Sequence, residues 1–229
     1  MAVEKVDFDQ YASDYDRIMK EDLEFFGEEN SYFAEYKIKI IKDTFSGIPH
    51  KILDYGCGIG RNIPFYHKYF PEAEIYGCDI SEKSLEIAQK DNPQSKFFLI
   101  SEENIQNQFE EFDIVSISCV FHHIEPSLRN GTIEFIHQLL RPKGSVYIFE
   151  HNPINPVTRK IVRDCVWDED AILLPAKESE TLINHTGMKI EKKRYTVFFP
   201  ALLKFLRPME KLLGFIPLGG QYYIKGNKT

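Results

Sequence analysis

Apolar and polar positions along the first two thirds of the chain switch repeatedly between two patterns. Short apolar runs predict buried strands at residues 51–55, 74–80, 96–100, 112–118 and 145–150. Apolar residues three and four positions apart predict the intervening helices, at residues 62–69, from residue 81 onward and at 129–140. Because parallel neighbours need long crossover connections, strands separated by helices predict a parallel, doubly wound sheet.

The regions before and after this core show the same two patterns. Near the start, Phe8, Tyr11, Ala12 and Tyr15 have the spacing of one helix face, which predicts either an aromatic lid helix or ordinary amphipathic packing. After the fifth strand, prolines predict an irregular loop, because each disfavours helix in the residue before it. The remaining predictions are helices at residues 31–45, 158–165 and 178–186, and strands at 189–198 and 221–225.

Residues 198–217 form an apolar and cationic segment that contains Pro208. One interpretation is a helix packed on the sheet between the last two strands, which we favour. The other is a face that contacts a membrane surface or a lipid acceptor, as basic amphipathic helices can.

Composition and charge narrow the class of protein. The chain has 229 residues and a formal net charge of -7, which argues against nucleic acid as a partner, since phosphate binding needs a basic surface. The four cysteines lack CxxC spacing, so we expect a reducing, cytoplasmic location and no metal site. No apolar run is long enough for a transmembrane segment, and the N-terminus does not have the pattern of a signal peptide.

A glycine-rich turn follows the first predicted strand. Glycines at positions 56, 58 and 60 predict a backbone that leaves room for a ligand. A dinucleotide fingerprint would place its third glycine at position 61, which is Arg61. Asp54, two residues before the first glycine, would repel a pyrophosphate but suits an ammonium group. Asp79 ends the second strand and can accept ribose hydroxyls, which fits either kind of cofactor.

Four segments of the chain, with this turn among them, resemble the class I S-adenosylmethionine-dependent methyltransferases over roughly residues 8–150. They are ILDYGCGIG, IYGCDIS, FDIVSISCVFHHI and LLRPKGSVYIFE, in the family's order and spacing. The resemblance implies a Rossmann-like α/β fold with a doubly wound sheet of about seven strands, mostly parallel with an antiparallel C-terminal strand and helices on both faces. It also implies S-adenosylmethionine as cofactor and S-adenosylhomocysteine as product.

The same resemblance implies the cofactor-binding residues. Around the methionine end of the cofactor it places Asp54, Gly56, Cys57 and Gly58, and at the ribose and adenine it places Asp79 and Ile80. Tyr11 or Tyr15 would close over the cofactor, and Cys119 with Val120 would line its near wall. Many relatives carry an Asp after the third strand, where this chain has Ser101, so Glu102 is expected to replace it.

Three histidines follow the fourth and fifth strands and can reach the carboxyl edge of the sheet, where open α/β sheets bind ligands. A base is needed only for a hydroxyl or acidic-carbon acceptor, and His123 and His151 are the candidates. We therefore expect methyl transfer to a small-molecule or carrier-linked acceptor. The alternative is a non-catalytic methyltransferase-like module that binds a partner.

We expect one domain throughout the chain. Lid helices would occupy residues 1–48, the cofactor-binding core residues 49–151, and the acceptor side residues 152–229.

Overall fold

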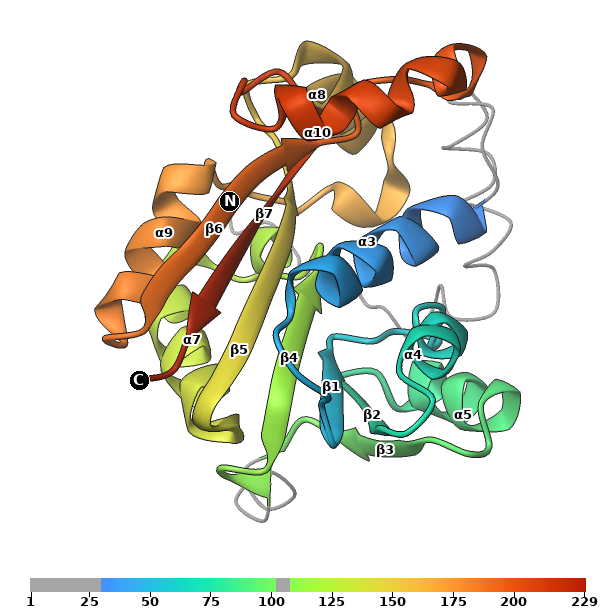
Figure 1. Cartoon of the computed structure of the whole chain (residues 1–229), viewed down its shortest axis with the longest axis vertical. Coiled ribbons are helices and arrows are strands. Elements are labelled where there is room, and N and C mark those ends of the chain that lie inside the picture. The colour runs from blue at the N-terminus through green and yellow to red at the C-terminus, as the bar shows by residue number, and fades with distance from the viewer. Residues whose placement is uncertain (1–29, 102–107) are drawn as a thin grey trace.

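A computed structural model describes residues 30–101 and 108–229, which form a single seven-stranded sheet with the order β3-β2-β1-β4-β5-β7-β6 (Figure 1). Its strands are β1 (Lys51–Tyr55), β2 (Glu74–Asp79), β3 (Lys96–Leu99), β4 (Phe112–Ser118), β5 (Leu140–His151), β6 (Lys189–Thr196) and β7 (Gln221–Asn227). The five strands β3, β2, β1, β4 and β5 are parallel to one another. Strand β7 is antiparallel to both of its neighbours, β5 and β6. The predicted sheet, with an antiparallel C-terminal strand, is confirmed.

Helices cover both faces of this sheet, as predicted. Figure 1 shows α3 and α4 on one side and α7 and α9 on the other. The α-helices are α3 (Asn30–Thr44), α4 (Ile63–Tyr69), α5 (Glu82–Asp91), α7 (Arg129–Leu139), α8 (Pro156–Asp164), α9 (Ala176–His185) and α10 (Glu210–Leu213). Shorter 3-10 helices are η3 (Phe121–His123), η4 (Pro126–Leu128), η5 (Val166–Asp168) and η6 (Ala201–Met209).

Two apolar clusters form the core, one on each face. Side chains alternate across a strand, so Ile52 packs in the cluster with α3 and α4, and Leu53 in the cluster with α7 and α9. Ile114 and Val115 on β4 divide in the same way. Burial on both faces explains why the central strands are continuous apolar runs in the sequence.

The start of β5 differs from the prediction. We expected the strand to start at Ser145, but it begins at Leu140 and contains a register shift between Phe112 and Ile114 of the paired strand. Lys143 takes a positive φ of 66° there. A side chain at Gly144 would lie 2.9 Å from the Phe112 carbonyl oxygen, so only glycine lets the two strands stay paired through the bulge.

The segment 198–217 also differs from the favoured prediction. It is a 3-10 helix, η6, followed by the short α10, and its large apolar side chains do not pack on the sheet: Leu202 is 88% exposed and Phe205 is 71% exposed. Polar contacts hold it to α3 and to β6: the Tyr36 hydroxyl donates to Glu210 at 2.9 Å, and the Tyr195 amide donates to the Gly214 carbonyl oxygen at 2.7 Å. The expectation of a helix packed on the sheet is therefore wrong.

None of the helices in the described part of the chain is both long enough and apolar enough to cross a membrane. The predicted lid helix with Tyr11 and Tyr15, and the residue Glu102, lie outside the described residues.

Candidate functional site

The glycine turn is fastened to the end of β2 by backbone hydrogen bonds. The amides of Gly56 and Cys57 both donate to the Cys78 carbonyl oxygen, at 2.8 and 2.9 Å. The amide of Gly58 donates to one carboxylate oxygen of Asp79 at 2.8 Å, and the Ser81 amide donates to the other at 2.9 Å. The carboxylate at the end of β2 is therefore held directly beside the turn that follows β1.

Positive φ angles at Gly56 and Gly58, of 70° and 52°, make the turn. The two glycines serve different purposes. A Cβ at Gly56 would lie 2.4 Å from a methyl carbon of Val120, so glycine there lets the turn pack on the segment after β4. A Cβ at Gly58 would meet no atom within 4 Å, so the turn has open space at this point.

Asp54 is a buried acid directly beneath the turn, with only 1% of its surface exposed. Its carboxylate accepts hydrogen bonds from the Asn62 amide at 3.0 Å and from the Tyr66 hydroxyl at 3.4 Å. Burial raises the pKa of Asp54 to about 7, although the Asn62 bond and the nearby Lys37 ammonium oppose this rise. A cationic ligand beside Asp54 would favour its ionised form.

Cys119 directly follows β4 and has an unusual backbone conformation, with φ at 58°. The ammonium nitrogen of Lys37, on α3, lies 3.7 Å from its sulfur, and the Gln221 side chain lies 3.9 Å away. Burial alone would raise the pKa of the Cys119 thiol, but Lys37 and His151 outweigh burial and lower the pKa to about 7. The same interaction with Cys119 raises the pKa of His151, against the effect of burial.

His122 and His123 lie next to one another in η3, with ring centroids 4.2 Å apart, and the His151 ring lies 5.1 Å from His122. Glu150 orients His122, not His151: one of its oxygens lies 2.7 Å from His122 Nδ1, and the other accepts the amides of Val120 and Phe121. The three histidines expected at the carboxyl edge of the sheet therefore form one group.

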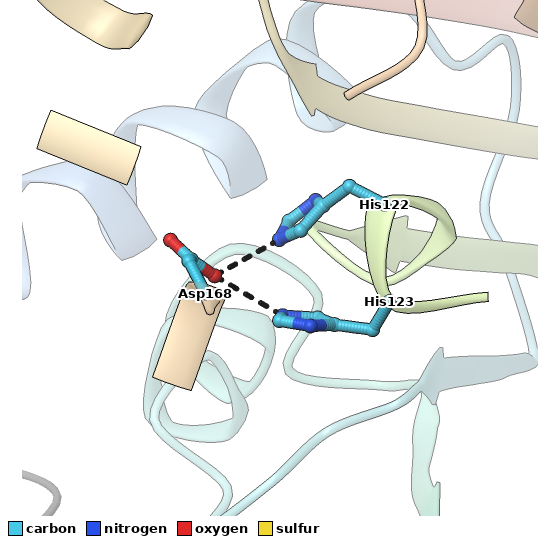
Figure 2. A group of neighbouring side chains, drawn as sticks. All are labelled: His122, His123 and Asp168. Carbon is cyan, nitrogen blue, oxygen red and sulfur yellow. Dashed lines mark ion pairs between the residues drawn. The ribbon is translucent and has the colours of Figure 1, made fainter. Parts of the chain in front are cut away.

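Asp168, from η5, faces both histidines of η3, as Figure 2 shows. Its Oδ1 atom lies 3.4 Å from His122 Nε2 and 3.3 Å from His123 Nε2. Burial would lower the pKa of His122, but the carboxylates of Glu150 and Asp168 outweigh burial and raise this pKa well above its usual value. Burial and the charge of His122 lower the pKa of His123.

The structure brings most of the described predicted residues to one edge of the sheet. These are Asp54, Gly56, Gly58, Asp79, Cys119, Val120 and His151, linked by the contacts above. Ile80 follows Asp79 and is 65% exposed. The side chain of Cys57 lies beneath the turn against Gly77, and its amide is bonded to Cys78, so it packs the turn and presents little to a ligand.

Sequence reasoning missed Lys37, Asn62, Tyr66, Asp168 and Asp170. Asn62 directly follows the glycine turn, so its position alone could have suggested it. Lys37 and Asp168 come from segments whose place against β4 only the tertiary structure reveals.

Parts of this chain are similar to known methyltransferases. Residues 52–144 match the family described as "Methyltransferase domain". The demethylmenaquinone methyltransferase of Chlorobaculum parvum is 32% identical over 155 residues, 67% of this chain and 62% of that protein. The tRNA N(3)-methylcytidine methyltransferase Mettl2 of Drosophila melanogaster is 28% identical over 135 residues, 54% of this chain and 42% of that protein. The chain thus spans less than two thirds of the length of these curated relatives.

Among solved structures, a SAM-dependent methyltransferase from Archaeoglobus fulgidus superimposes with a TM-score of 0.69. Its sequence is 15% identical, and the match covers 90% of this chain and 97% of that one, so the two share a fold. The match over residues 52–144, the sheet order and the glycine turn are all those of class I S-adenosylmethionine-dependent methyltransferases, which this chain resembles.

Proposed function

We propose that this protein transfers the methyl group of S-adenosylmethionine to a small-molecule or carrier-linked acceptor. One observation carries the proposal: the turn with open space at Gly58 has two carboxylates close to it in the chain and in space, Asp54 in the strand that leads into the turn and Asp79, which accepts the Gly58 amide. An ammonium group suits the first carboxylate and a ribose diol suits the second, so the residues present fit this cofactor.

The cofactor would supply a methyl carbon already activated by positive sulfur. The chain's own task is then to hold the acceptor in line and to exclude water, and such positioning can contribute about 7–11 kcal/mol. We assign cofactor binding to residues 49–151 and acceptor binding to residues 152–229, because β5 leads from the first region to the second at His151.

Proton transfer from a hydroxyl or acidic-carbon acceptor would fall to His151. It lies beside Cys119, whose neighbour Val120 contacts Gly56, so it is linked to the cofactor side of the edge. The interaction with Cys119 raises the pKa of His151, whereas burial and the His122 charge lower the pKa of His123, so His151 is the stronger base of the two. His123 is the second candidate, although both of its ring nitrogens face carboxylates.

A small acceptor fits the charge of the chain better than a nucleic acid does, since the formal net charge is -7. The name of the C. parvum relative points to a small molecule, whereas that of the D. melanogaster relative points to tRNA. The exposed apolar segment 198–217 adjoins α3, which carries Lys37, and this supports an apolar acceptor or contact with lipid.

Calorimetry with S-adenosylmethionine and S-adenosylhomocysteine tests the proposal. Wild type should bind both ligands, Gly58→Val should bind neither because its side chain fills the open space, and Asp79→Ala should bind at least tenfold more weakly. Asp91→Ala, an exposed acid on α5, is the matched control and should bind as wild type does. Absence of binding to wild type would overturn the proposal and leave only a non-catalytic module acting through a partner.

A further inference from the structure

The carboxylates around His122 and His123 carry more negative charge than two neutral imidazoles can compensate for. Three carboxylates face the two imidazoles: Glu150 at His122 Nδ1, Asp170 at His123 Nδ1, and Asp168 at both Nε2 atoms. Glu150 and Asp168 are nearly or fully buried. Buried negative charges are costly unless a cation or hydrogen-bond donors compensate for them.

Protons alone leave one of the four contacts unsatisfied even in the best case, an imidazolium at His122 beside a neutral His123. A neutral imidazole has one N–H donor, yet both nitrogens of both rings face a carboxylate oxygen. Two imidazolium ions would satisfy every carboxylate, but their ring centroids would lie only 4.2 Å apart and the charges would repel. A cation between the Nε2 atoms and Asp168 would remove the conflict, because each histidine could then keep its single proton on Nδ1.

The two contacts of His122 differ in length, whereas the contacts of His123 with Asp168 and Asp170 are both 3.3 Å long. His122 Nδ1 lies 2.7 Å from Glu150, which is the length of a charge-assisted hydrogen bond. The two Nε2 atoms lie 3.4 and 3.3 Å from Asp168 Oδ1, which is longer than such a bond. Ligands at about 2.0–2.2 Å from a tetrahedral metal are about 3.3–3.5 Å apart, so the Nε2 contacts have the spacing of metal ligands.

We propose that His122 Nε2, His123 Nε2 and a carboxylate oxygen of Asp168 bind a divalent transition metal ion, with zinc as the best match. All three atoms lie within 4.8 Å of one another (Figure 2). Two imidazoles and one carboxylate are ligands that Zn²⁺ prefers, and three protein ligands leave a fourth position open for water or a substrate atom. Carboxylates behind ligating histidines fix the ring orientation, as Glu150 and Asp170 do here.

The backbone around the site is built to hold these ligands together. The Ile172 amide donates to the His122 carbonyl oxygen at 2.7 Å and so fastens the segment after Asp168 to η3. Buried Arg129 donates to the carbonyl oxygens of both segments, Ile124 at 2.9 Å and Ile172 at 2.6 Å. Access remains from one side, since the side chains of His123 and Asp168 keep 15% and 9% of their surface exposed.

The inference contradicts our expectation that the chain has no metal site. That expectation rested on the spacing of cysteines, whereas this site uses none. It does not depend on methyl transfer, because its test measures metal binding directly.

The test uses Co²⁺ and Zn²⁺ with the whole, chelator-treated protein. Wild type should bind one equivalent of Co²⁺ with the visible absorption of a tetrahedral nitrogen and oxygen site, and Zn²⁺ should displace it. His123→Ala and Asp168→Asn should bind at least 100-fold more weakly, and Asp170→Asn about 10- to 100-fold more weakly because it only positions His123. His185→Ala, a surface histidine paired with Glu134, is the matched control and should bind as wild type does.

His122 is too buried for a safe substitution, so the variants change the two more exposed ligands, and thermal unfolding checks that each has folded. The proposal fails if wild type binds no Co²⁺ at one equivalent, or if folded His123→Ala and Asp168→Asn bind it as wild type does. Charge-transfer absorption from a thiolate ligand would also overturn it, because it would place the metal at a cysteine.

Discussion

The ammonium nitrogen of Lys37 lies 3.7 Å from the sulfur of Cys119, joining α3 to the end of β4. Cys119 also differs from the other three cysteines in exposure, since it is partly exposed and they are buried. Lys37 is the largest influence that lowers the pKa of Cys119, to about 7, so the thiolate is well populated near neutral pH.

Lys37→Met should therefore raise the pKa of Cys119 and slow its alkylation by iodoacetamide at pH 7. The pH profile of the alkylation rate, followed by mass spectrometry, should shift to higher pH in the variant. Lys39→Met, a neighbouring lysine on α3, is the control. Unchanged profiles in Lys37→Met would mean that the ammonium does not act on this thiol. Bound S-adenosylhomocysteine should also slow alkylation if Cys119 lines the cofactor site.

Asp54 should make cofactor binding depend on pH. Burial raises its pKa from 3.8 to about 7, so a large fraction of the free protein carries a proton on Asp54 at pH 7. A ligand ammonium favours the ionised carboxylate, so binding should release a fraction of a proton at pH 7 and should tighten as pH rises through 7.

Calorimetry in buffers with different ionisation enthalpies measures this proton release. Asp54→Asn should bind more weakly and without the release, while Asp43→Asn, an exposed acid on α3, should retain it. Equal binding heats in all buffers for wild type would contradict the assignment of Asp54 to the ammonium group.

Gly60→Ala should destabilise the fold by about 1–3 kcal/mol. An added Cβ would lie 3.0 Å from the Asn92 amide nitrogen and 3.1 Å from the Ala88 Cβ, and Gly60 has a φ of 79°. Gly131→Ala is the contrasting variant. Gly131 lies in α7 and an added Cβ would meet nothing within 4 Å, so this variant should stabilise the fold by about 0.5–1 kcal/mol. Urea unfolding measures both, and equal stability of the two variants would show that the turn does not pack on α5 as described.

The exposed apolar segment 198–217 should attach the protein to lipid. Leu202 and Phe205 are largely exposed, and the exposed cations Lys204 and Lys211 accompany them. Wild type should float with vesicles that contain anionic lipid, and Phe205→Glu should remain in the unbound fraction. Lys177→Ala, which removes one exposed charge from α9, lowers the net charge by the same amount and is the control. A wild type that does not float would remove the lipid interpretation.

The sequence predicted the sheet well because its strongest signals are local. Burial on both faces makes β1 and β4 continuous apolar runs, and the helix expected from residue 81 starts there because Ser81 accepts the Ser84 amide. The predicted start of β5 was wrong because a bulge accommodates Pro142, Lys143 and Gly144 within the paired strand.

The contacts at the carboxyl edge of the sheet were harder to predict because they join residues that are far apart in the sequence. The glycine turn and Asp79 come together as their family order implied, but the partners of Glu150 and Cys119 did not follow from their neighbours in sequence. Glu150 binds His122 across the β4–β5 pair, and Asp168 reaches the same ring from η5. Such pairings depend on how segments after β5 fold back, which no spacing along the chain encodes.

The position of buried Arg129 limits how this protein can be re-engineered. Its guanidinium joins η3, the segment at Ile172 and Glu178 at the start of α9. A different segment grafted between residues 152 and 171 therefore stays anchored only if the Ile172 carbonyl oxygen still accepts the hydrogen bond from Arg129. Any exchange of this segment should therefore retain Arg129 and both of its carbonyl acceptors, at Ile124 and Ile172.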